Sequence, residues 1–355
     1  MRPVKDYLEV CIGEGVFPGV SWVIGGKEGI FEKGTVGLLG AGLGRVREDS
    51  IYDLASLTKL FITLALMKQF EEGLIRLEDR VDFFLPFFRG SPLGGSTLFQ
   101  LLTHTAPLPG GTTLYRHVHS REDMLETIRG TGIRYDDGVV YTCEAFILLG
   151  EIAAAVDLME LDKIIRLRVT APLKMNDTCY RPPSAPLDRI APTEDCPSRG
   201  GVLRGHVHDE NAELMGGVSG NAGIFSIAVD MARLSGAVLA SLEGREGAFL
   251  KKPVAEMMIR NYTEGRGENR GLGWMIKGPG SAAGDLMSFR SFGHTGFTGT
   301  SVWIDPEKDI YAVLLSNRIH PRRDNMGIFR TRHIFHNLAV LYRDGHERET
   351  PGGLS

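Results

Sequence analysis

The sequence predicts a fold of the α/β (α+β) class, in which an antiparallel β-sheet flanked by helices is built from both ends of the chain. Two observations favour this class. Strand-like runs occur before residue 40 and again after residue 216, and helical patterns fill the stretch between them. Strands from the two ends bury their apolar faces by sharing one sheet, which makes the middle of the chain an insert. We therefore expect a sheet domain from residues 1–80 and 204–355 and a mainly helical insert domain from residues 81–203.

The N-terminal part predicts a helix, two strands and a buried helix. Residues 4–14 have the spacing of an amphipathic helix, and residues 19–24 form an apolar run that ends at two glycines. A Gly-Lys-Glu-Gly turn then leads to a second strand over residues 29–36. Residues 60–67 are apolar on nearly every side, so they predict a central helix that starts near Ser56.

The middle and C-terminal parts add helices and then strands. Thr97-Leu98-Phe99-Gln100 fits a capping box, and residues 181–203, rich in Pro, Gly and charge, predict a long loop. Pro306-Glu307-Lys308-Asp309 is a turn sequence, so the strands beside it predict a hairpin. The remaining expected helices are residues 121–129, 143–156, 161–169, 230–242 and 327–342, and the expected strands are residues 222–227, 272–276, 288–293, 301–305 and 310–316.

Composition narrows the possible functions. With 43% hydrophobic and 24% charged residues among 355, the chain has the make-up of a globular protein with a core. A net charge of −4 suggests no phosphate-binding surface, so we expect no nucleic-acid partner. No apolar run reaches the roughly 18 residues of a membrane span, and the first residues lack the layout of a secretion signal, which predicts a cytoplasmic protein. The four scattered cysteines predict free thiols.

Ser56 and Lys59 are the first candidates for chemistry. Three positions apart on a helix, they share one face. A serine hydroxyl needs a neighbour that takes its proton, and a lysine does so only if its pKa falls, which burial favours. The same pair is also compatible with a helix cap beside a solvated lysine.

Two further segments are candidates, each with an ordinary structural explanation beside the functional one. Tyr141 precedes a predicted helix; a tyrosine near cations acts as a general base, although a half-buried tyrosine with a bonded hydroxyl is common. His294-Thr295-Gly296-Phe297 follows a predicted strand. Gly296 would let a substrate lie along the strand edge, although the segment also suits a plain turn.

In this order, the three segments resemble the three boxes of the serine β-lactamase and penicillin-binding protein superfamily. The sequence is similar to its class C-like and family VIII esterase-like branch at Asp53-Leu54-Ala55-Ser56-Leu57-Thr58-Lys59, at Leu101-Leu102-Thr103-His104-Thr105 and at His208-Asp209-Glu210-Asn211-Ala212. Similar stretches follow at Gly216-Gly217 and at Ala222-Gly223-Ile224-Phe225-Ser226. The resemblance covers roughly residues 15–320.

The resemblance implies a β-lactamase/transpeptidase-like fold with the site in a cleft, and a serine hydrolase that forms an acyl-enzyme without metal or cofactor. By position, Ser56 would be the nucleophile, and Lys59 and Tyr141 would share the acid and base roles. The N–H groups of Ser56 and Phe297 would form the oxyanion hole. His294, Thr295, Gly296 and Cys143 would contact a small-molecule ester, amide or β-lactam substrate.

Two positions depart from the family pattern. Cys143 stands where class C β-lactamases usually have an asparagine, and a thiol is a poor substitute for an amide. His294 stands where lysine is usual, and a histidine is mostly uncharged at neutral pH. Both changes weaken the binding of a β-lactam, so we expect an esterase, an amidase or a peptidase rather than an efficient β-lactamase.

Other readings remain less favoured. His117-Val118-His119 and His206-Val207-His208-Asp209-Glu210 suggest a zinc site, but no H-E-x-x-H motif is present. There is no G-x-S-x-G nucleophile elbow, and Gly40-Ala41-Gly42-Leu43-Gly44 lacks the spacing of a dinucleotide site. An inactive family member that serves as a binding or scaffold protein is the main alternative to an enzyme.

Overall fold

A six-stranded antiparallel sheet forms the centre of the computed structural model, which describes residues 4–110, 114–136, 138–182 and 186–349. The strand order is β2-β1-β11-β10-β9-β8. The strands are β1 (Gly19–Gly26), β2 (Gly29–Gly37), β8 (Met275–Ile276), β9 (Phe292–Thr295), β10 (Ser301–Asp305) and β11 (Ile310–Ser316). Val20 on β1 is paired with Ser316 on β11, so the two ends of the chain meet in one sheet, as the sequence predicts.

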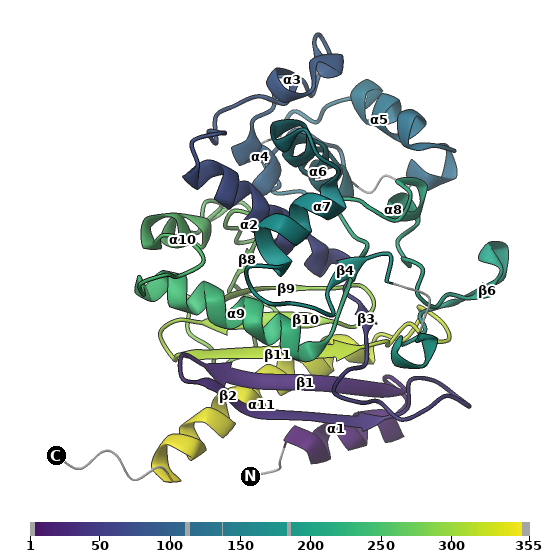
Figure 1. Ribbon diagram of the computed structural model, residues 1–355, viewed down its shortest axis with the longest axis vertical. Helices are drawn as coiled ribbons and strands as arrows, with labels where there is room; N and C mark the ends of the chain where they lie inside the picture. The colour runs from purple at the N-terminus through teal and green to yellow at the C-terminus, as the bar shows by residue number, and fades with distance from the viewer. Residues whose placement is uncertain (1–3, 111–113, 137, 183–185, 350–355) are drawn as a thin grey trace.

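Helices cover both faces of this sheet (Figure 1). On one face lie α1 (Val4–Gly13) and α11 (Gly327–Glu349), which contact each other; on the other, α9 (Ala228–Glu243) contacts β1 and β11. Every residue of β1 and of β11 is buried because both of their faces are covered. That explains why these strands appear in the sequence as nearly continuous apolar runs rather than alternating ones.

The remaining helices gather beyond α9, around the long buried helix α2 (Thr58–Glu71). They are α3 (Val81–Phe84), α4 (Leu98–Leu102), α5 (Arg121–Gly130), α6 (Cys143–Asp157), α7 (Leu161–Ile165), α8 (Glu210–Leu214) and α10 (Lys252–Met258). Eleven of the fourteen residues of α2 are buried, and α2 contacts α6 and α7. The predicted capping box opens α4, since the Gln100 amide donates to Thr97 Oγ1 at 3.2 Å. The domain border at residues 81–203 stays a prediction.

Small ladders connect these parts. One joins β3 (Tyr52–Asp53), β7 (Ile224–Ser226) and β4 (Cys179–Tyr180), and another joins β5 (Asp195–Cys196) and β6 (Gly201–Val202). The second ladder lies within the predicted loop at 181–203, of which residues 183–185 are outside the described residues. The four cysteines are free thiols, as predicted. No helix in the described part of the chain is long and apolar enough to cross a membrane.

Some predicted elements are displaced. The strand expected at 272–276 is limited to β8, because Gly273 is left-handed (φ 76°) and the Leu272 amide donates to Met258 instead of a neighbouring strand. The strand expected at 288–293 starts only at Phe292, after a turn that the Ser291 amide closes onto Ser288. The helix expected at 161–169 widens into a π-helical turn at Arg166–Thr170, and α10 was not predicted.

Candidate active site

The segment before α2 presents Ser56 on a tight turn. Strand β3 ends at Asp53, and Ala55 then adopts a left-handed conformation (φ 48°), which is costly for a residue with a Cβ. Asp53 holds this turn because its Oδ1 accepts the Ala55 amide at 2.8 Å. A 3-10 turn at Ala55–Leu57 follows and leads into α2, so Ser56 stands at the start of the helix.

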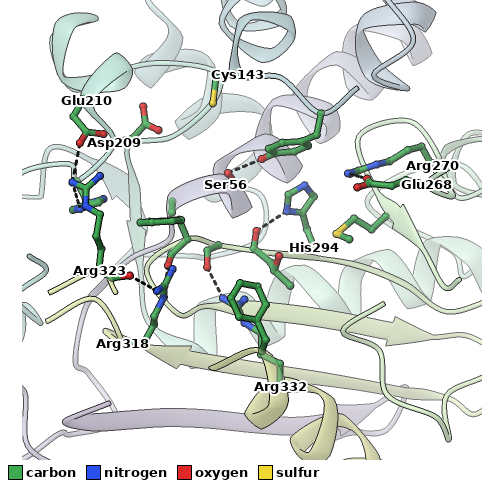
Figure 2. Close-up of a pocket in the computed structure, with 18 of the residues that line it drawn as sticks. Ser56, Cys143, Asp209, Glu210, Glu268, Arg270, His294, Arg318, Arg323 and Arg332 are labelled. Carbon is green, nitrogen blue, oxygen red and sulfur yellow. Dashed lines mark hydrogen bonds and ion pairs between the residues drawn. The ribbon is translucent and has the colours of Figure 1, made fainter. Parts of the chain in front are cut away.

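Ser56, Lys59 and Tyr141 come together, although Tyr141 is far away in sequence. Ser56 Oγ lies 3.0 Å from Lys59 Nζ and 2.7 Å from the Tyr141 hydroxyl oxygen, the second contact being drawn in Figure 2. Lys59 Nζ also donates to the carbonyl oxygen of Asn221 at 2.9 Å. The serine hydroxyl is therefore within hydrogen-bond reach of two groups that carry protons.

Tyr141 is held in place by its neighbours along the chain and by His104. Thr142 caps α6 through its side chain, which fixes the residue before it. The His104 carbonyl accepts the Val140 amide at 3.0 Å, and the His104 ring lies 4.8 Å from the Tyr141 ring. Burial, followed by the nearby charges of Arg270 and Lys59, holds the pKa of His104 well below its usual value, so this histidine is neutral.

The charge of Lys59 depends on the groups that surround it. Its side chain is fully buried, and burial alone lowers the pKa of a lysine. The acidic groups around it, first Tyr141 and then Cys143, outweigh burial, and the pKa of Lys59 is raised above its ordinary value. Lys59 would need a lowered pKa to take the serine proton, and with the raised pKa it is an ammonium group at neutral pH.

The third segment lies against the nucleophile turn. At the end of β9, a Cβ on Gly296 would lie 2.4 Å from the Leu54 carbonyl oxygen, so only glycine fits without movement. Thr300 Oγ1 donates to the same oxygen at 3.0 Å. His294 is buried, with Nδ1 2.8 Å from the Thr295 carbonyl oxygen. Burial, then the charge of Arg270, lowers the pKa of His294 well below its usual value, so the position that is lysine in the family carries no charge here.

A cavity of about 500 Å³ is lined by Ser56, Tyr141 and the third segment. Phe297, 48% exposed, stacks on His208 at its edge, with ring centroids 5.7 Å apart. Cys143 also faces the cavity, and burial raises the pKa of its thiol to about 12. The lining comprises Ala55, Ser56, Tyr115, Tyr141, Cys143, His208, Asp209, Glu210, Glu268, Arg270, Met275, His294, Thr295, Gly296, Phe297, Arg318, Arg323, Phe329 and Arg332.

Several charged residues of the cavity were not predicted. Figure 2 shows Arg270 and Glu268 on one side of Ser56, and Asp209, Glu210 and Arg323 on the other. Arg270 is 3% exposed, and its guanidinium carbon lies 5.2 Å from the centre of the Tyr141 ring. Arg318 and Arg332 bond to backbone carbonyls beneath the third segment. Isolated arginines carry no motif, so no sequence pattern indicated them.

Of the histidines weighed as metal ligands, His208 has other partners. His208 donates its amide to Asp53 Oδ2 at 2.8 Å, and its Nε2 lies 2.9 Å from Glu194 Oε2. Among the described residues, no three histidine, cysteine, aspartate or glutamate side chains gather as a metal site would require. His208 and Asp209 instead order the cavity wall, since Asp209 caps α8.

A buried lysine and a tyrosine that converge on a serine at a helix start, beside a strand edge, define a serine hydrolase site. The Beta-lactamase family model matches residues 4–334, and the chain belongs to this family of serine hydrolases.

Individual relatives carry names of different kinds. A Salmonella schwarzengrund (strain CVM19633) protein, provisionally named a D-alanyl-D-alanine carboxypeptidase, is 33% identical over 310 residues, which are 78% of this chain and 71% of the relative. The octameric penicillin-binding protein homologue from Pyrococcus abyssi has a TM-score of 0.75 at 21% identity, over 95% of this chain and 76% of its own. EstCE1, a hydrolase with promiscuous acyltransferase activity, has a TM-score of 0.76 at 20% identity, over 95% of this chain and 97% of its own.

Proposed function

We propose that the chain hydrolyses small esters in preference to β-lactams, through an acyl-enzyme on Ser56. The observation that carries this proposal is the position of Ser56 Oγ on the cavity wall, within 3.0 Å of Lys59 and 2.7 Å of Tyr141. The preference for esters is supported by the neutral His294 and by the protonated thiol of Cys143. Neither group supplies the charge or the amide that favours a β-lactam.

In the proposed acylation, Ser56 Oγ attacks the carbonyl carbon of the ester. Because Lys59 is an ammonium group, the serine proton goes to the Tyr141 oxygen, which lies 2.7 Å from Ser56 Oγ. Tyr141 then passes this proton to the leaving alcohol as the carbon–oxygen bond breaks. A water molecule later attacks the acyl-serine and gives its proton to Tyr141, which passes it to Ser56 Oγ as the acyl–oxygen bond breaks and the acid is released.

The oxyanion that forms on the carbonyl oxygen is assigned to the N–H groups of Ser56 and Phe297. Both residues line the cavity, and within the described ranges neither amide has a protein acceptor. Free N–H groups that point at the developing charge stabilise the transition state more than the substrate.

A D-amino-acid carboxypeptidase is the second candidate. Arg270 lines the cavity, and its Nε and Nη1 atoms are buried without a partner among the described residues. A terminal carboxylate is the group that such an arginine binds best. The provisional name of the Salmonella relative points in the same direction.

The first experiment compares a short-chain nitrophenyl ester, a chromogenic cephalosporin and a D-alanyl-D-alanine peptide with the wild type and Ser56→Ala. We expect ester turnover to exceed cephalosporin turnover, and Ser56→Ala to lose at least about a thousandfold on each substrate that is cleaved. The control is Ser281→Ala, since the Ser281 hydroxyl lies outside the cavity and has no partner among the described residues. It should keep wild-type rates.

The other outcomes of this comparison would contradict parts of the proposal. If the cephalosporin is the better substrate, the proposed preference is wrong. If only the peptide is cleaved, the second candidate replaces the first. If Ser56→Ala keeps full activity, the acyl-serine mechanism is wrong, and if the wild type cleaves nothing and takes no fluorophosphonate label on Ser56, the chain is an inactive scaffold.

A further inference from the structure

Two arginines donate hydrogen bonds to backbone carbonyl groups of the loop that follows β9. Arg332, on α11, donates through Nη2 to the carbonyl oxygen of Gly296 and, at 2.8 Å, to that of Thr300. Arg318 donates through Nε to the carbonyl oxygen of Phe297 at 2.9 Å, and its guanidinium carbon lies 4.5 Å from the centre of the Phe297 ring. Figure 2 shows Arg332 and Arg318 on the same side of the site, below His294.

The hydrogen bond from Arg332 to the Gly296 carbonyl acts on the peptide group between Gly296 and Phe297. The carbonyl of Gly296 and the N–H of Phe297 belong to the same amide, so a cation bonded to the oxygen withdraws electron density from the nitrogen. Hydrogen bonds polarise one another in this way, and the effect is strongest in a site of low dielectric. A Phe297 N–H polarised by a guanidinium is a stronger donor toward the cavity than an ordinary amide.

The charge that Arg332 carries is unusual for its location. Arg332 is 4% exposed and Arg318 is 3% exposed, and within the described residues neither forms an ion pair with a carboxylate. Burial, followed by the nearby Arg318, lowers the pKa of Arg332 to about 9, which still leaves the group charged at neutral pH. A buried cation without a carboxylate costs stability, and structures keep such costs mainly where function needs them.

The rest of the loop is fixed to the nucleophile turn. The Gly296 amide donates to the Thr300 carbonyl at 2.8 Å, which closes a short loop whose two ends Arg332 joins. Thr298 Oγ1 donates to the Asp53 carbonyl at 2.7 Å. A shift of Arg332 would therefore move the Phe297 amide relative to Ser56.

We propose that Arg332 is a positioning residue of the oxyanion site: its charge polarises the Gly296–Phe297 peptide and its two carbonyl bonds fix the direction of the Phe297 N–H. The inference rests on the proposed acyl-serine mechanism and deepens it. Arg332 acts when the carbonyl oxygen becomes an anion, so its loss should lower kcat and leave KM almost unchanged.

The test compares Arg332→Gln, which keeps a hydrogen-bond donor but loses the charge, with Arg332→Lys, which keeps the charge but ends one bond short of Nη2, the single atom that reaches both carbonyls. Hydrolysis of a short-chain nitrophenyl ester gives kcat and KM, with kcat expressed per site that reacts with a fluorophosphonate, so that misfolded protein is not counted. Inhibition by phenylboronic acid, which forms a tetrahedral anion on a reactive serine, reports on the oxyanion site.

Removing an oxyanion donor costs about 100- to 1000-fold in kcat; here the donor remains, so Arg332→Gln should lose about 10- to 50-fold. We expect KM within about threefold of the wild type and boronate affinity reduced by about the same factor as kcat. Arg332→Lys should recover most of the loss and remain about fivefold below the wild type.

The control variant is Arg168→Met. Arg168 is also largely buried, bonded to Asp157 at 2.6 Å and Glu72 at 2.8 Å, but lies outside the cavity. The Arg168→Met variant should have a lower melting temperature than the wild type, with unchanged kcat per site and boronate affinity.

The inference is overturned if Arg332→Gln keeps kcat per site and boronate affinity within twofold of the wild type while Ser56→Ala is inactive. If Ser56→Ala is active, the underlying mechanism fails instead, so the two failures are distinguishable. Should Arg332→Gln yield no folded protein, Arg332→Lys decides alone, because unchanged kcat and boronate affinity in that variant would contradict the two-carbonyl geometry.

Discussion

Ala55 is the residue whose backbone decides where Ser56 points. Its left-handed conformation is unusual for a residue with a Cβ, and it is maintained because Asp53 accepts the Ala55 amide with one carboxylate oxygen. The other oxygen of Asp53 accepts the His208 amide at 2.8 Å. The buried carboxylate of Asp53 therefore fixes both the turn before Ser56 and the cavity wall at His208. Burial raises the pKa of this carboxyl group above its ordinary value.

At the same scale, we predict that Cys143 is unreactive although it faces the cavity. Its thiol pKa of about 12 leaves almost no thiolate at pH 7.5, and the thiolate is the nucleophile. Treatment with iodoacetamide at that pH should leave Cys143 unmodified in peptide mass spectra and ester hydrolysis unchanged. Cys143→Ser, treated identically, controls for the other three cysteines. Carbamidomethylation of Cys143 in step with loss of activity would contradict the assigned protonation state.

The residue identities at the site were partly predictable. Ser56, Lys59, Tyr141 and the segment 294–297 stand in recognisable motifs. The structure brings all of them except Lys59 to one cavity, and the buried Lys59 lies 3.0 Å from Ser56 Oγ. Arg270 and Arg332 act through contacts with residues far away in sequence, and their own neighbours in the chain form no pattern. The charge of Lys59 could not be predicted from the sequence because it depends on the acidic groups that the fold places around it.

Among the elements, β9 leads directly into Gly296, which packs against the turn before Ser56. We predict that Gly296→Ala lowers ester kcat by at least about tenfold, because its Cβ would lie 2.4 Å from the Leu54 carbonyl and 2.1 Å from Thr300 Oγ1. Overpacking of this kind also costs about 1–3 kcal/mol of stability. Kinetics and chemical denaturation measure the two effects.

The matched control is Gly345→Ala in α11, where a Cβ meets nothing within 4 Å. Alanine favours a helix over glycine by up to about 1 kcal/mol, so this variant should be as stable as the wild type or more so, with unchanged kcat. A Gly296→Ala enzyme with wild-type kcat would show that the strand edge tolerates displacement and does not set the geometry of the site.

Elements with strong local signals were predicted to the residue. The hairpin of β10 and β11 follows from two apolar runs around Pro306-Glu307-Lys308-Asp309, and the start of α4 follows from its capping box. Strand β8 was predicted too long because the sequence does not reveal that Leu272 is bonded to Met258. The two-residue strands β5 and β6 are too short to leave a periodic pattern.

For the whole molecule, an ion network ties the segment before β5 to the chain between β11 and α11. Arg323 bonds to Glu194 and, at 2.8 Å, to Glu210, and His208 approaches Glu194 at 2.9 Å. Burial by itself raises the pKa of Glu194, but Arg323 and His208 outweigh it, and the pKa falls from 4.5 to about 2.

This shift predicts a dependence of stability on pH. A carboxyl group whose pKa is lower in the folded state stabilises the fold above its unfolded pKa of 4.5, and this contribution is lost as the pH falls through 2. Glu194→Gln should therefore be less stable than the wild type at pH 7, and the difference should shrink between pH 4.5 and 2. Guanidinium denaturation across that range measures it, with Glu264→Gln as a control from outside the network. A difference that is constant with pH would contradict the ionic origin.

The joining of both chain ends in one sheet has a consequence for how the enzyme is made. During synthesis Ser56 emerges well before the groups that complete its site, which lie on β9 and α11, more than 230 residues later. Because β11 pairs with β1, the sheet cannot close until the last strand has left the ribosome. A nascent chain thus carries Ser56 long before the cavity around it is complete, and the proposed hydrolysis cannot begin before β11 and α11 have been made.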